Sequence, residues 1–376
     1  MLILTINTGS SSLRLSLFTE NSNGLERLAE VHHDVIDTSG QSQLGDFIAS
    51  VDVAEIGLVV HRVVHGGARF TAPCLINAAV EEEIERLIPL APLHNSVAMI
   101  WIRHARQLLG ERVPQVAVFD TAFYRNLPEV AATYALPREL CQRHDIRRYG
   151  FHGIAHQAMW QRWREIRPKI KGGGQVISVQ LGSGCSITAI DNGMPVDTSM
   201  GFSPLEGLVM ATRSGDIDPT VMAYLQREAG LSANEIEQIL NKQSGLLGIS
   251  GDSGDMRVLL NSNTPEAELA VDIYCYRVRK YIGAYLAVLG GVDAILFGGG
   301  VGENSAQVRE KILRGMGWLG MELDPLLNDT SKGKEVCVST EKSQSEVWVV
   351  PVDEAQMMAL DAMGLVNEMK CGEQKI

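Results

Sequence analysis

The sequence predicts an α/β protein built from two duplicated domains, and three observations lead to this class. The chain has 376 residues, which at about 150 residues per domain predicts two domains, each large enough for a core of its own. Short apolar runs alternate with amphipathic segments, the pattern of sheets covered by helices on both faces. A strand-turn-strand unit near the N-terminus returns in the middle of the chain.

The repeated unit spans residues 3–18 in its first copy and residues 176–190 in its second. Each copy has two apolar runs joined by a turn rich in glycine and serine, which leaves backbone amides free to face a ligand. A shift of 173 positions aligns the two turns, laying Asn7 on Gln180, Gly9 on Gly182 and Ser10 on Ser183. We therefore expect each domain to open with a hairpin that faces phosphate.

Further strands and one long helix follow from the hydrophobic pattern. Apolar runs predict strands over residues 56–60, 116–119, 294–297 and 347–350. The helix is indicated by apolar residues at spacings of three and four, namely Val271, Cys275, Val278, Ile282, Tyr285 and Leu289. Most of the strands end in glycines, acids or histidines, so we expect their ends to line a cleft.

Charge and composition exclude several classes of partner. With 33 Lys and Arg against 45 Asp and Glu, the net charge of −12 argues against nucleic acid and anionic membranes as partners. The six cysteines lie at least 34 positions apart, which excludes a zinc knuckle and a compact disulfide framework. We find no signal peptide and no membrane segment, so we expect a cytoplasmic protein with reduced thiols.

Six short segments concentrate histidine, arginine, aspartate and glycine. Any one of them alone is more often structural than catalytic, because a histidine or arginine at a strand end usually has a hydrogen-bond partner in the protein. Together they are hard to explain by packing. They are residues 61–67, 91–95, 118–123, 148–153, 201–207 and 212–219.

With these segments, the sequence closely resembles the acetate kinase family. The match runs from the Asn-Thr-Gly-Ser-Ser-Ser turn at 7–12, through Gly-Val-Gly-Glu-Asn-Ser at 300–305, to Pro-Val-Asp-Glu at 351–354. The resemblance implies the superfamily of acetate and sugar kinases, heat-shock ATPases and actin, with duplicated ribonuclease-H-like domains and ATP in an interdomain cleft. We place the N-terminal domain at residues 1–123 plus a returning C-terminal helix at 357–376, and the nucleotide-binding domain at 124–356.

The resemblance assigns catalytic roles to six residues. Arg62 and Arg213 match the two arginines that hold the carboxylate and the phosphoryl group, a task suited to the guanidinium fork. His152 matches the histidine that contacts the transferring phosphoryl group. His94 and Asp120 match residues that position substrate and metal, and Gln180 lies where the family has a catalytic histidine. A buried hydrogen-bond network is the structural alternative for these positions.

The resemblance also implies a metal site, a nucleotide site and a substrate pocket. Asn7 and Glu354 match residues associated with Mg²⁺, with Mn²⁺ as an alternative, and oxygen ligands suit a hard cation. The structural alternative for Glu354 is an acid at a helix N-terminus. The nucleotide site matches Gly182, Ser183, Gly184, Asp255, Met256, Arg257, Gly300, Val301, Gly302 and Asn304, and the apolar pocket for the methyl group of the acid matches Val64, Leu93 and Pro204.

The resemblance implies reversible, Mg²⁺-dependent transfer of the γ-phosphate of ATP to acetate, which gives ADP and acetyl phosphate. It also implies that the protein is a homodimer. A carboxylate is ionised at pH 7, so it needs no general base and the catalysis consists of alignment and charge neutralisation. Direct in-line transfer through a loose transition state is what two arginines, His152 and Mg²⁺ can stabilise.

Three positions depart from the family, and they leave three hypotheses open. Gln180 replaces a histidine, Ser183 replaces an asparagine and Ser96 replaces a proline. The first hypothesis is a working acetate or propionate kinase. The second is a related kinase with another short-chain acid or phosphoryl donor. The third is a low-activity paralogue that binds nucleotide or acyl phosphate.

Overall fold

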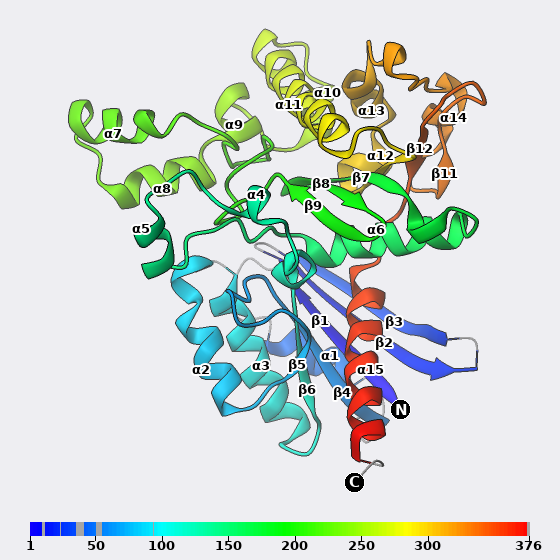
Figure 1. Ribbon diagram of the computed structural model, residues 1–376. Coiled ribbons are helices and arrows are strands. Elements are labelled where there is room, and N and C mark those ends of the chain that lie inside the picture. The colour runs from blue at the N-terminus through cyan, green and yellow to red at the C-terminus, as the bar shows by residue number, and fades with distance from the viewer. Residues whose placement is uncertain (10–11, 23, 35–40, 50–54, 93, 374–376) are drawn as a thin grey trace. The chain divides into compact units, whose positions relative to one another are not determined.

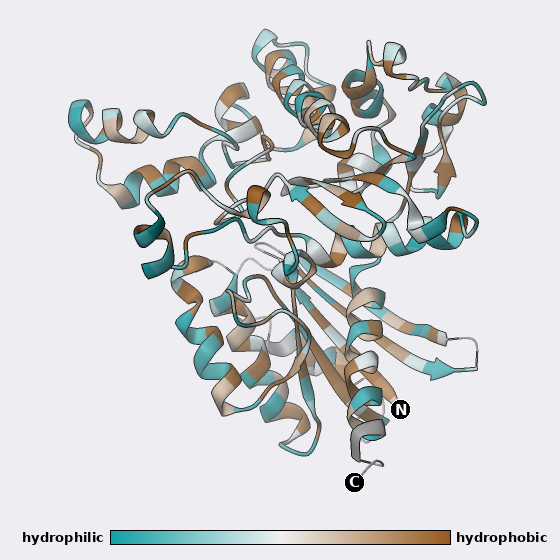
Figure 2. Cartoon of the chain, viewed as in Figure 1, coloured by the Kyte–Doolittle hydropathy of each residue, from teal (hydrophilic) through white to brown (hydrophobic). Residues whose placement is uncertain are grey.

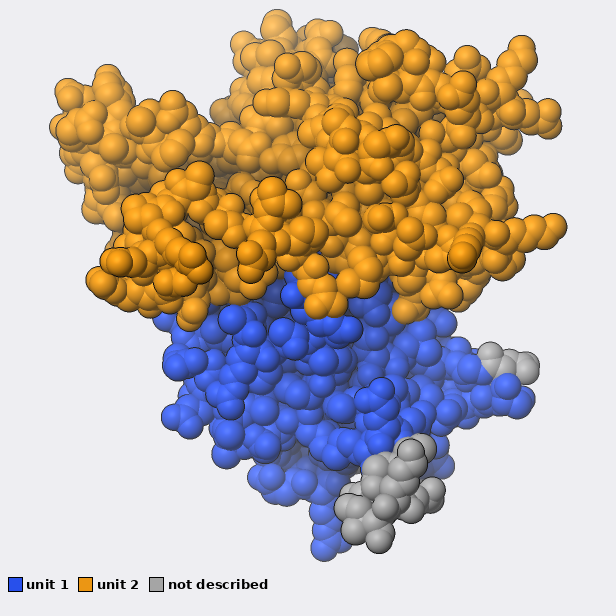
Figure 3. Space-filling view, in the orientation of Figure 1, with its two compact units in different colours: residues 1–125, 151–158, 353–376 blue, residues 126–150, 159–352 orange. Residues whose placement is uncertain are grey.

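The computed structural model describes residues 1–9, 12–22, 24–34, 41–49, 55–92 and 94–373. The chain forms two compact units, which Figure 3 shows in different colours. Unit 1 comprises residues 1–125, 151–158 and 353–376, and unit 2 comprises residues 126–150 and 159–352. Unlike the predicted N-terminal domain, unit 1 includes residues 151–158, because Ile154 packs into the core of that unit.

Unit 1 contains a six-stranded sheet with the strand order β3-β2-β1-β4-β6-β5 (Figure 1). Strands β1, β2 and β3 form an antiparallel meander, and β4 and β6 continue the sheet parallel to β1. The elements of this unit are β1 (Leu2–Thr8), β2 (Ser12–Asn21), β3 (Gly24–Asp34), α1 (Gln41–Ala49), β4 (Ile56–Val63), β5 (Cys74–Leu75), α2 (Ala78–Arg86), α3 (Asn95–Leu109), β6 (Gln115–Phe119), the start of α6 (Gly153–Ile166) and α15 (Glu354–Glu373), with 3-10 helices at Ile88–Leu90 and Asp120–Tyr124.

Helices cover both faces of this sheet, and the alternation of side chains along β1 shows how. Leu2, Leu4 and Ile6 pack on one face against residues of α1 and α3, including Trp101. Ile3 packs on the opposite face with α15. The period of two places successive side chains on opposite faces of a strand. Accordingly, brown predominates along the central strands of this sheet in Figure 2, whereas α2 and α3 alternate between brown and teal.

Unit 2 contains a second six-stranded sheet, with the order β11-β12-β10-β7-β8-β9. Its long helix α11 buries Val271, Cys275, Val278 and the rest of the predicted apolar stripe. The elements are α4 (Glu129–Ala132), α5 (Arg138–Arg143), most of α6, β7 (Gln175–Leu181), β8 (Cys185–Asp191), β9 (Met194–Thr198), α7 (Pro219–Glu228), α8 (Ala233–Lys242), α9 (Gly245–Ser250), α10 (Met256–Leu260), α11 (Pro265–Leu289), β10 (Ala294–Gly298), α12 (Gly299–Asn304), α13 (Ala306–Leu313), α14 (Pro325–Thr330), β11 (Val336–Cys337) and β12 (Glu346–Val349), with 3-10 helices at Lys171–Gly173 and Gly317–Leu319.

The two sheets have the same topology, which confirms the predicted duplication. Read from the meander outward, β3-β2-β1-β4-β6-β5 corresponds strand for strand to β9-β8-β7-β10-β12-β11. The predicted shift of 173 positions lays β1, residues 2–8, directly on β7, residues 175–181. The predicted α/β fold class is therefore confirmed, and every strand predicted from an apolar run is present. None of the described helices is long and apolar enough to cross a membrane.

The partly buried carboxyl of Asp361 on α15 predicts a pH dependence of stability. Burial raises its pKa to about 6 from the usual 3.8, although the amide of Gln157 donates to it at 3.2 Å. Between these values the native state keeps a proton that the unfolded chain loses, so stability falls as the pH rises. Asp361→Asn should therefore raise the free energy of unfolding at pH 7 by about 3 kcal/mol and leave it unchanged near pH 3.5.

Urea titrations at the two pH values provide the measurement. The free energies of unfolding of Asp361→Asn and wild type are compared at each pH. If they differ by the same amount at both pH values, the ionisation of Asp361 does not destabilise the protein.

Candidate active site

In unit 1, three predicted site residues lie at the same edge of the sheet. Asn7 is near the end of β1, Arg62 is near the end of β4 and Asp120 directly follows β6. These strands are parallel neighbours, so their carboxyl ends meet at one edge, where open α/β sheets bind ligands. Glu354 is the first residue of α15, which packs on the same sheet.

These four residues form one hydrogen-bonded group, which we call the Arg62 cluster. The Nε and Nη2 atoms of Arg62 donate to the two carboxylate oxygens of Asp120 at 2.9 and 2.7 Å. Its Nη1 atom donates to Oδ1 of Asn7 at 3.1 Å and lies 3.7 Å from Oε2 of Glu354. The amide of Asn7 in turn donates to Oε2 of Glu354 at 2.7 Å. The guanidinium plane of Arg62 is thereby fixed by three side chains.

Burial and charge oppose each other throughout the Arg62 cluster. Burial alone would lower the pKa of Arg62, but the carboxylates of Asp120 and Glu354 raise it well above its usual value. Burial would raise the pKa of Glu354, yet Arg62 and the Asn7 hydrogen bond together hold it below its usual range. The side chain of Asp120 is only 1% exposed, and a charge that is buried so deeply persists only when it is paired. Burial raises the pKa of Asp120, and the charge and hydrogen bonds of Arg62 oppose that rise, so the ionised form of Asp120 depends on Arg62.

His152 joins the Arg62 cluster through its backbone. Its N–H donates to the Asp120 carboxylate, and its φ of +56° is in the left-handed region that non-glycine residues rarely adopt. A Cβ atom on the following residue, Gly153, would lie 2.0 Å from the carbonyl oxygen of Asp120. Strained backbone of this kind concentrates at functional sites.

One atom of the Arg62 cluster, Oε1 of Glu354, is suited to binding a hard cation. In Glu354, Oε2 accepts the Asn7 hydrogen bond, whereas within the described residues no hydrogen bond to Oε1 is found. A carboxylate oxygen with a free lone pair beside an amide oxygen suits Mg²⁺, which usually keeps several waters and phosphate oxygens in its shell. The described residues contain no group of three or more His, Cys, Asp or Glu that could hold a metal by themselves. Any cation here would need ligands from a substrate and water.

The other predicted residues of unit 1 are not all in the Arg62 cluster. Val64 is 6% exposed and follows β4, two positions after Arg62. His94 is the N-cap residue of α3, where its side chain makes no capping hydrogen bond. Leu93 lies outside the described residues.

In unit 2, Arg213 presents a guanidinium without an acidic partner in the described part of the chain. Its Nη1 atom donates to the carbonyl of Pro204 at 2.7 Å, which is the one hydrogen bond found for this side chain there. Burial lowers the pKa of Arg213. Because its side chain donates only to Pro204 among the described residues, Arg213, unlike Arg62, keeps most of its donors available for an oxyanion.

The turn that joins β7 and β8 lies beside the segment of Arg213. The carbonyl of Ser183 accepts a hydrogen bond from the Ala211 N–H at 3.0 Å, and the Gly182 N–H donates to the Gly184 carbonyl at 3.0 Å. At the end of β7, Oε1 of Gln180 is buried without a hydrogen-bond partner in the described residues. A buried amide oxygen usually has a hydrogen-bond partner, so this atom can accept a hydrogen bond from a ligand or from water.

The glycine-rich helix α12 approaches the same turn. Gly299 has a φ of +77°, and a Cβ atom there would lie 2.6 Å from the carbonyl of Leu181 and 3.0 Å from the Gln180 side chain. A larger residue would therefore push the backbone of α12 away from the end of β7. Gly300, Val301, Gly302 and Asn304 all belong to this short helix, so the structure brings the predicted glycine loop and Gln180 together.

The three predicted adenosine residues begin helix α10. Asp255 is its N-cap and accepts a hydrogen bond from the Arg257 N–H, while its carboxylate pairs with the Arg257 guanidinium at 2.6 Å. Met256 is 4% exposed. The preceding residue, Gly254, approaches the carbonyl of Ala211 so closely that a Cβ atom would lie 2.8 Å from it. This segment therefore packs against the backbone that leads to Arg213.

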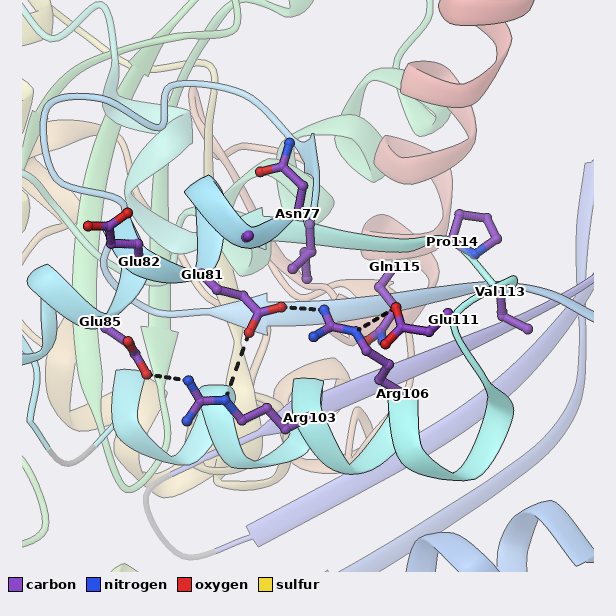
Figure 4. A pocket seen from close by; sticks show the side chains of 12 residues that line it. Asn77, Glu81, Glu82, Glu85, Arg103, Arg106, Glu111, Val113, Pro114 and Gln115 are labelled. Carbon is purple, nitrogen blue, oxygen red and sulfur yellow. Dashed lines mark hydrogen bonds and ion pairs between the residues drawn. The ribbon is translucent and has the colours of Figure 1, made fainter.

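A hollow between α2 and α3 in unit 1 contains none of the predicted residues (Figure 4). Its arginines are already paired, since Arg106 contacts Glu81 and Glu111, and Arg103 contacts Glu81 and Glu85. Internal neutralisation of this kind indicates a surface ion-pair network.

The matching topology of the two sheets defines the chain as a duplicated α/β protein. Residues 32–360 match the Acetokinase family. The chain is 48% identical over 312 residues to the acetate kinase of Chloroherpeton thalassium, an alignment that covers 82% of this chain and 75% of that protein. It therefore belongs to the acetokinase family.

Solved structures agree with this membership. The acetate kinase of Porphyromonas gingivalis superposes with a TM-score of 0.84 at 37% identity, covering 97% of this chain and 99% of that one. A propionate kinase from Francisella tularensis gives a TM-score of 0.87, also at 37% identity, with 96% of this chain and 98% of that chain covered.

The packing of Gly153 predicts a sensitive position, to which the sequence analysis assigned no role although it lies in the segment 148–153. In Gly153→Ala the new methyl group must displace the Asp120 carbonyl or the backbone of His152, so we expect phosphoryl transfer to fall about 100-fold. Turnover numbers with ATP as phosphoryl donor provide the measurement.

Gly364→Ala is the matched control for this variant and should retain activity, because position 364 lies in α15 and a Cβ atom there would meet nothing within 4 Å. Normal turnover in Gly153→Ala would contradict the requirement for this close approach.

Proposed function

We propose that this chain is an acetate kinase that transfers the γ-phosphate of ATP to acetate. The observation that carries the proposal is the contrast between two arginines in a member of the acetokinase family. Arg62 is fixed by Asp120, Asn7 and Glu354, whereas Arg213 has a single carbonyl partner in the described residues. One arginine is thus held in a set orientation, and the other keeps donors for an incoming oxyanion.

In this proposal the acceptor carboxylate binds to Arg62. Such a carboxylate is already ionised at pH 7, so its oxygen can attack the γ-phosphorus without a base. The bond from this phosphorus to the bridging oxygen of ADP breaks as the new bond forms, and charge spreads over the phosphoryl oxygens. By family resemblance, Arg213 and His152 are assigned to that charge, Val64, Leu93 and Pro204 to the methyl group of the acid, and His94 and Asp120 to the substrate.

The nucleotide is proposed to bind in unit 2. The Gly182-Ser183-Gly184 turn and the glycine loop of α12 offer backbone amides to its phosphates, and Asp255, Met256 and Arg257 contact the adenosine. The close packing of Gly299 on Leu181 supports this assignment, because it sets two amide-rich segments side by side. Gln180 can point its amide N–H group toward a phosphate, which is compatible with a buried, unpartnered oxygen.

Asn7 and Glu354 are the proposed residues for Mg²⁺, with Mn²⁺ as an alternative. When bound, the cation would neutralise charge on the phosphates. The low pKa of Glu354 supports this role, since the carboxylate remains ionised and available at neutral pH. The expectations of a homodimer and of a cytoplasmic location remain predictions that light scattering and cell fractionation can test.

Propionate is a second candidate acceptor. It is supported by the likeness to the Francisella tularensis propionate kinase, which matches this chain with a TM-score of 0.87. One extra methylene in an apolar pocket changes discrimination by only about 10 to 200-fold, so both acids must be assayed.

Acyl phosphate formation tests the proposal. Incubation with ATP, Mg²⁺ and acetate or propionate, followed by trapping with hydroxylamine, should give many turnovers per chain. Arg213→Ala should reduce the rate about 100 to 1,000-fold, because it removes a donor that stabilises developing charge.

Arg257→Ala, which changes a side chain that is 88% exposed, is the comparison variant and should mainly raise the KM for ATP. If wild type binds ATP but forms no acyl phosphate with any short-chain acid, the chain is a nucleotide-binding paralogue.

A further inference from the structure

Glu303, the fifth residue of α12, holds two backbone amides with one oxygen atom. Its Oε1 accepts hydrogen bonds from the Gly299 N–H at 2.9 Å and from the Val352 N–H at 3.1 Å. Gly299 is the first residue of the glycine loop, and Val352 lies two positions before Glu354 in the chain. One carboxylate oxygen thus connects the proposed nucleotide loop with the segment that leads to the proposed metal residue.

The sheet of unit 2 brings these two amides together. Strand β10 pairs in parallel with β12, and the Val350 N–H donates to the Phe297 carbonyl at 2.9 Å just beyond the paired strands. A Cβ atom on Gly298 would lie 2.6 Å from Cγ2 of Val352, so the close approach needs glycine. The segments that leave β10 and β12 are therefore neighbours, as Figure 1 shows for α12 and β12, and Glu303 satisfies an amide from each.

We propose that Glu303 is a positioning residue that couples nucleotide binding at α12 to the placement of Glu354. The inference rests on the proposed function, because it takes α12 as part of the nucleotide site and Glu354 as the metal residue. A nucleotide that orders the Gly299 amide also orders Oε1 of Glu303, and through it the Val352 amide. Since coupling of binding sites is reciprocal, the metal and the nucleotide strengthen each other's binding through this carboxylate.

Arg309 provides a matched comparison, because it holds the same helix without contacting Val352. Its side chain is fully buried and donates to the carbonyl oxygens of Gly302 at 2.6 Å and Glu303 at 3.2 Å. It also donates to Oδ1 of Asn328 at 2.9 Å. Burial lowers the pKa of Arg309 to about 10, so the guanidinium stays charged at neutral pH. Arg309 should therefore support nucleotide binding alone.

Calorimetric titration with ADP tests the coupling without relying on turnover. The dissociation constant is measured in Mg²⁺ and again in EDTA, and the ratio of the two values reports the coupling. In Glu303→Ala we expect ADP binding in Mg²⁺ to weaken about tenfold and the ratio to fall, because two charge-assisted hydrogen bonds are lost. Glu303→Gln keeps an oxygen acceptor in place and should retain most of the wild-type ratio.

Two further variants separate coupling from general damage. Arg309→Lys should weaken ADP binding by the same factor in Mg²⁺ and in EDTA, leaving the ratio unchanged. Glu310→Ala removes a glutamate on α13 that pairs with Arg314 and should bind as wild type does. Circular dichroism checks that each variant is folded.

The proposal is overturned if Glu303→Ala leaves the ratio of the ADP dissociation constants unchanged. It is also overturned if Glu303→Gln lowers this ratio as much as Glu303→Ala does. Failure of the proposed function looks different: wild type would form no acyl phosphate in the hydroxylamine assay, while the ratio and its loss in Glu303→Ala could still be measured.

Discussion

The structure of unit 1 at its sheet edge depends on the bidentate ion pair between Arg62 and Asp120. Both side chains are almost fully buried, and a buried charge without a partner costs several kcal/mol. Each partner therefore requires the other, and Asn7 and Glu354 both lie beside the Nη1 atom of Arg62. Because the Asp120 carboxylate also accepts the His152 N–H, the ion pair fixes a strained histidine backbone too. One interaction thus orients the groups proposed to meet the acceptor, the metal and the phosphoryl group.

Unit 2 repeats the fold but uses it differently. Its sheet has the same strand order, and Gln180 occupies the position that corresponds to Asn7. Instead of an ion-pair network, this edge carries glycine-rich backbone and Arg213, whose donors are mostly available in the described residues. Duplication followed by divergence therefore gives one edge built from charged side chains, where we propose that the acceptor and the metal bind. The other edge is built from backbone amides, where we propose that the nucleotide binds.

The fold could be predicted from the sequence because its determinants are local. Apolar runs located the central strands, and the spacing of Val271 to Leu289 located the longest helix. The contacts that shape the site were not accessible in this way. Gly153 is required by the carbonyl of Asp120, 33 positions earlier, and Glu303 binds Val352, 49 positions later. Such contacts arise only when strands are arranged in a sheet, so spacing in the sequence does not indicate them. Family resemblance named Arg62 and Asp120, but their bidentate pairing emerged from the structure.

The most direct test of this account is a double-mutant cycle of Arg62→Lys with Asp120→Asn, measured on kcat/KM for acyl phosphate formation. Lysine keeps the charge but loses the fork, and asparagine keeps the shape but loses the charge. If the ion pair orients the other groups, each single variant should lower kcat/KM nearly as much as the double variant does. The coupling energy should then be at least about 1 kcal/mol. Strictly additive losses would show that Arg62 and Asp120 act independently and would contradict the central claim.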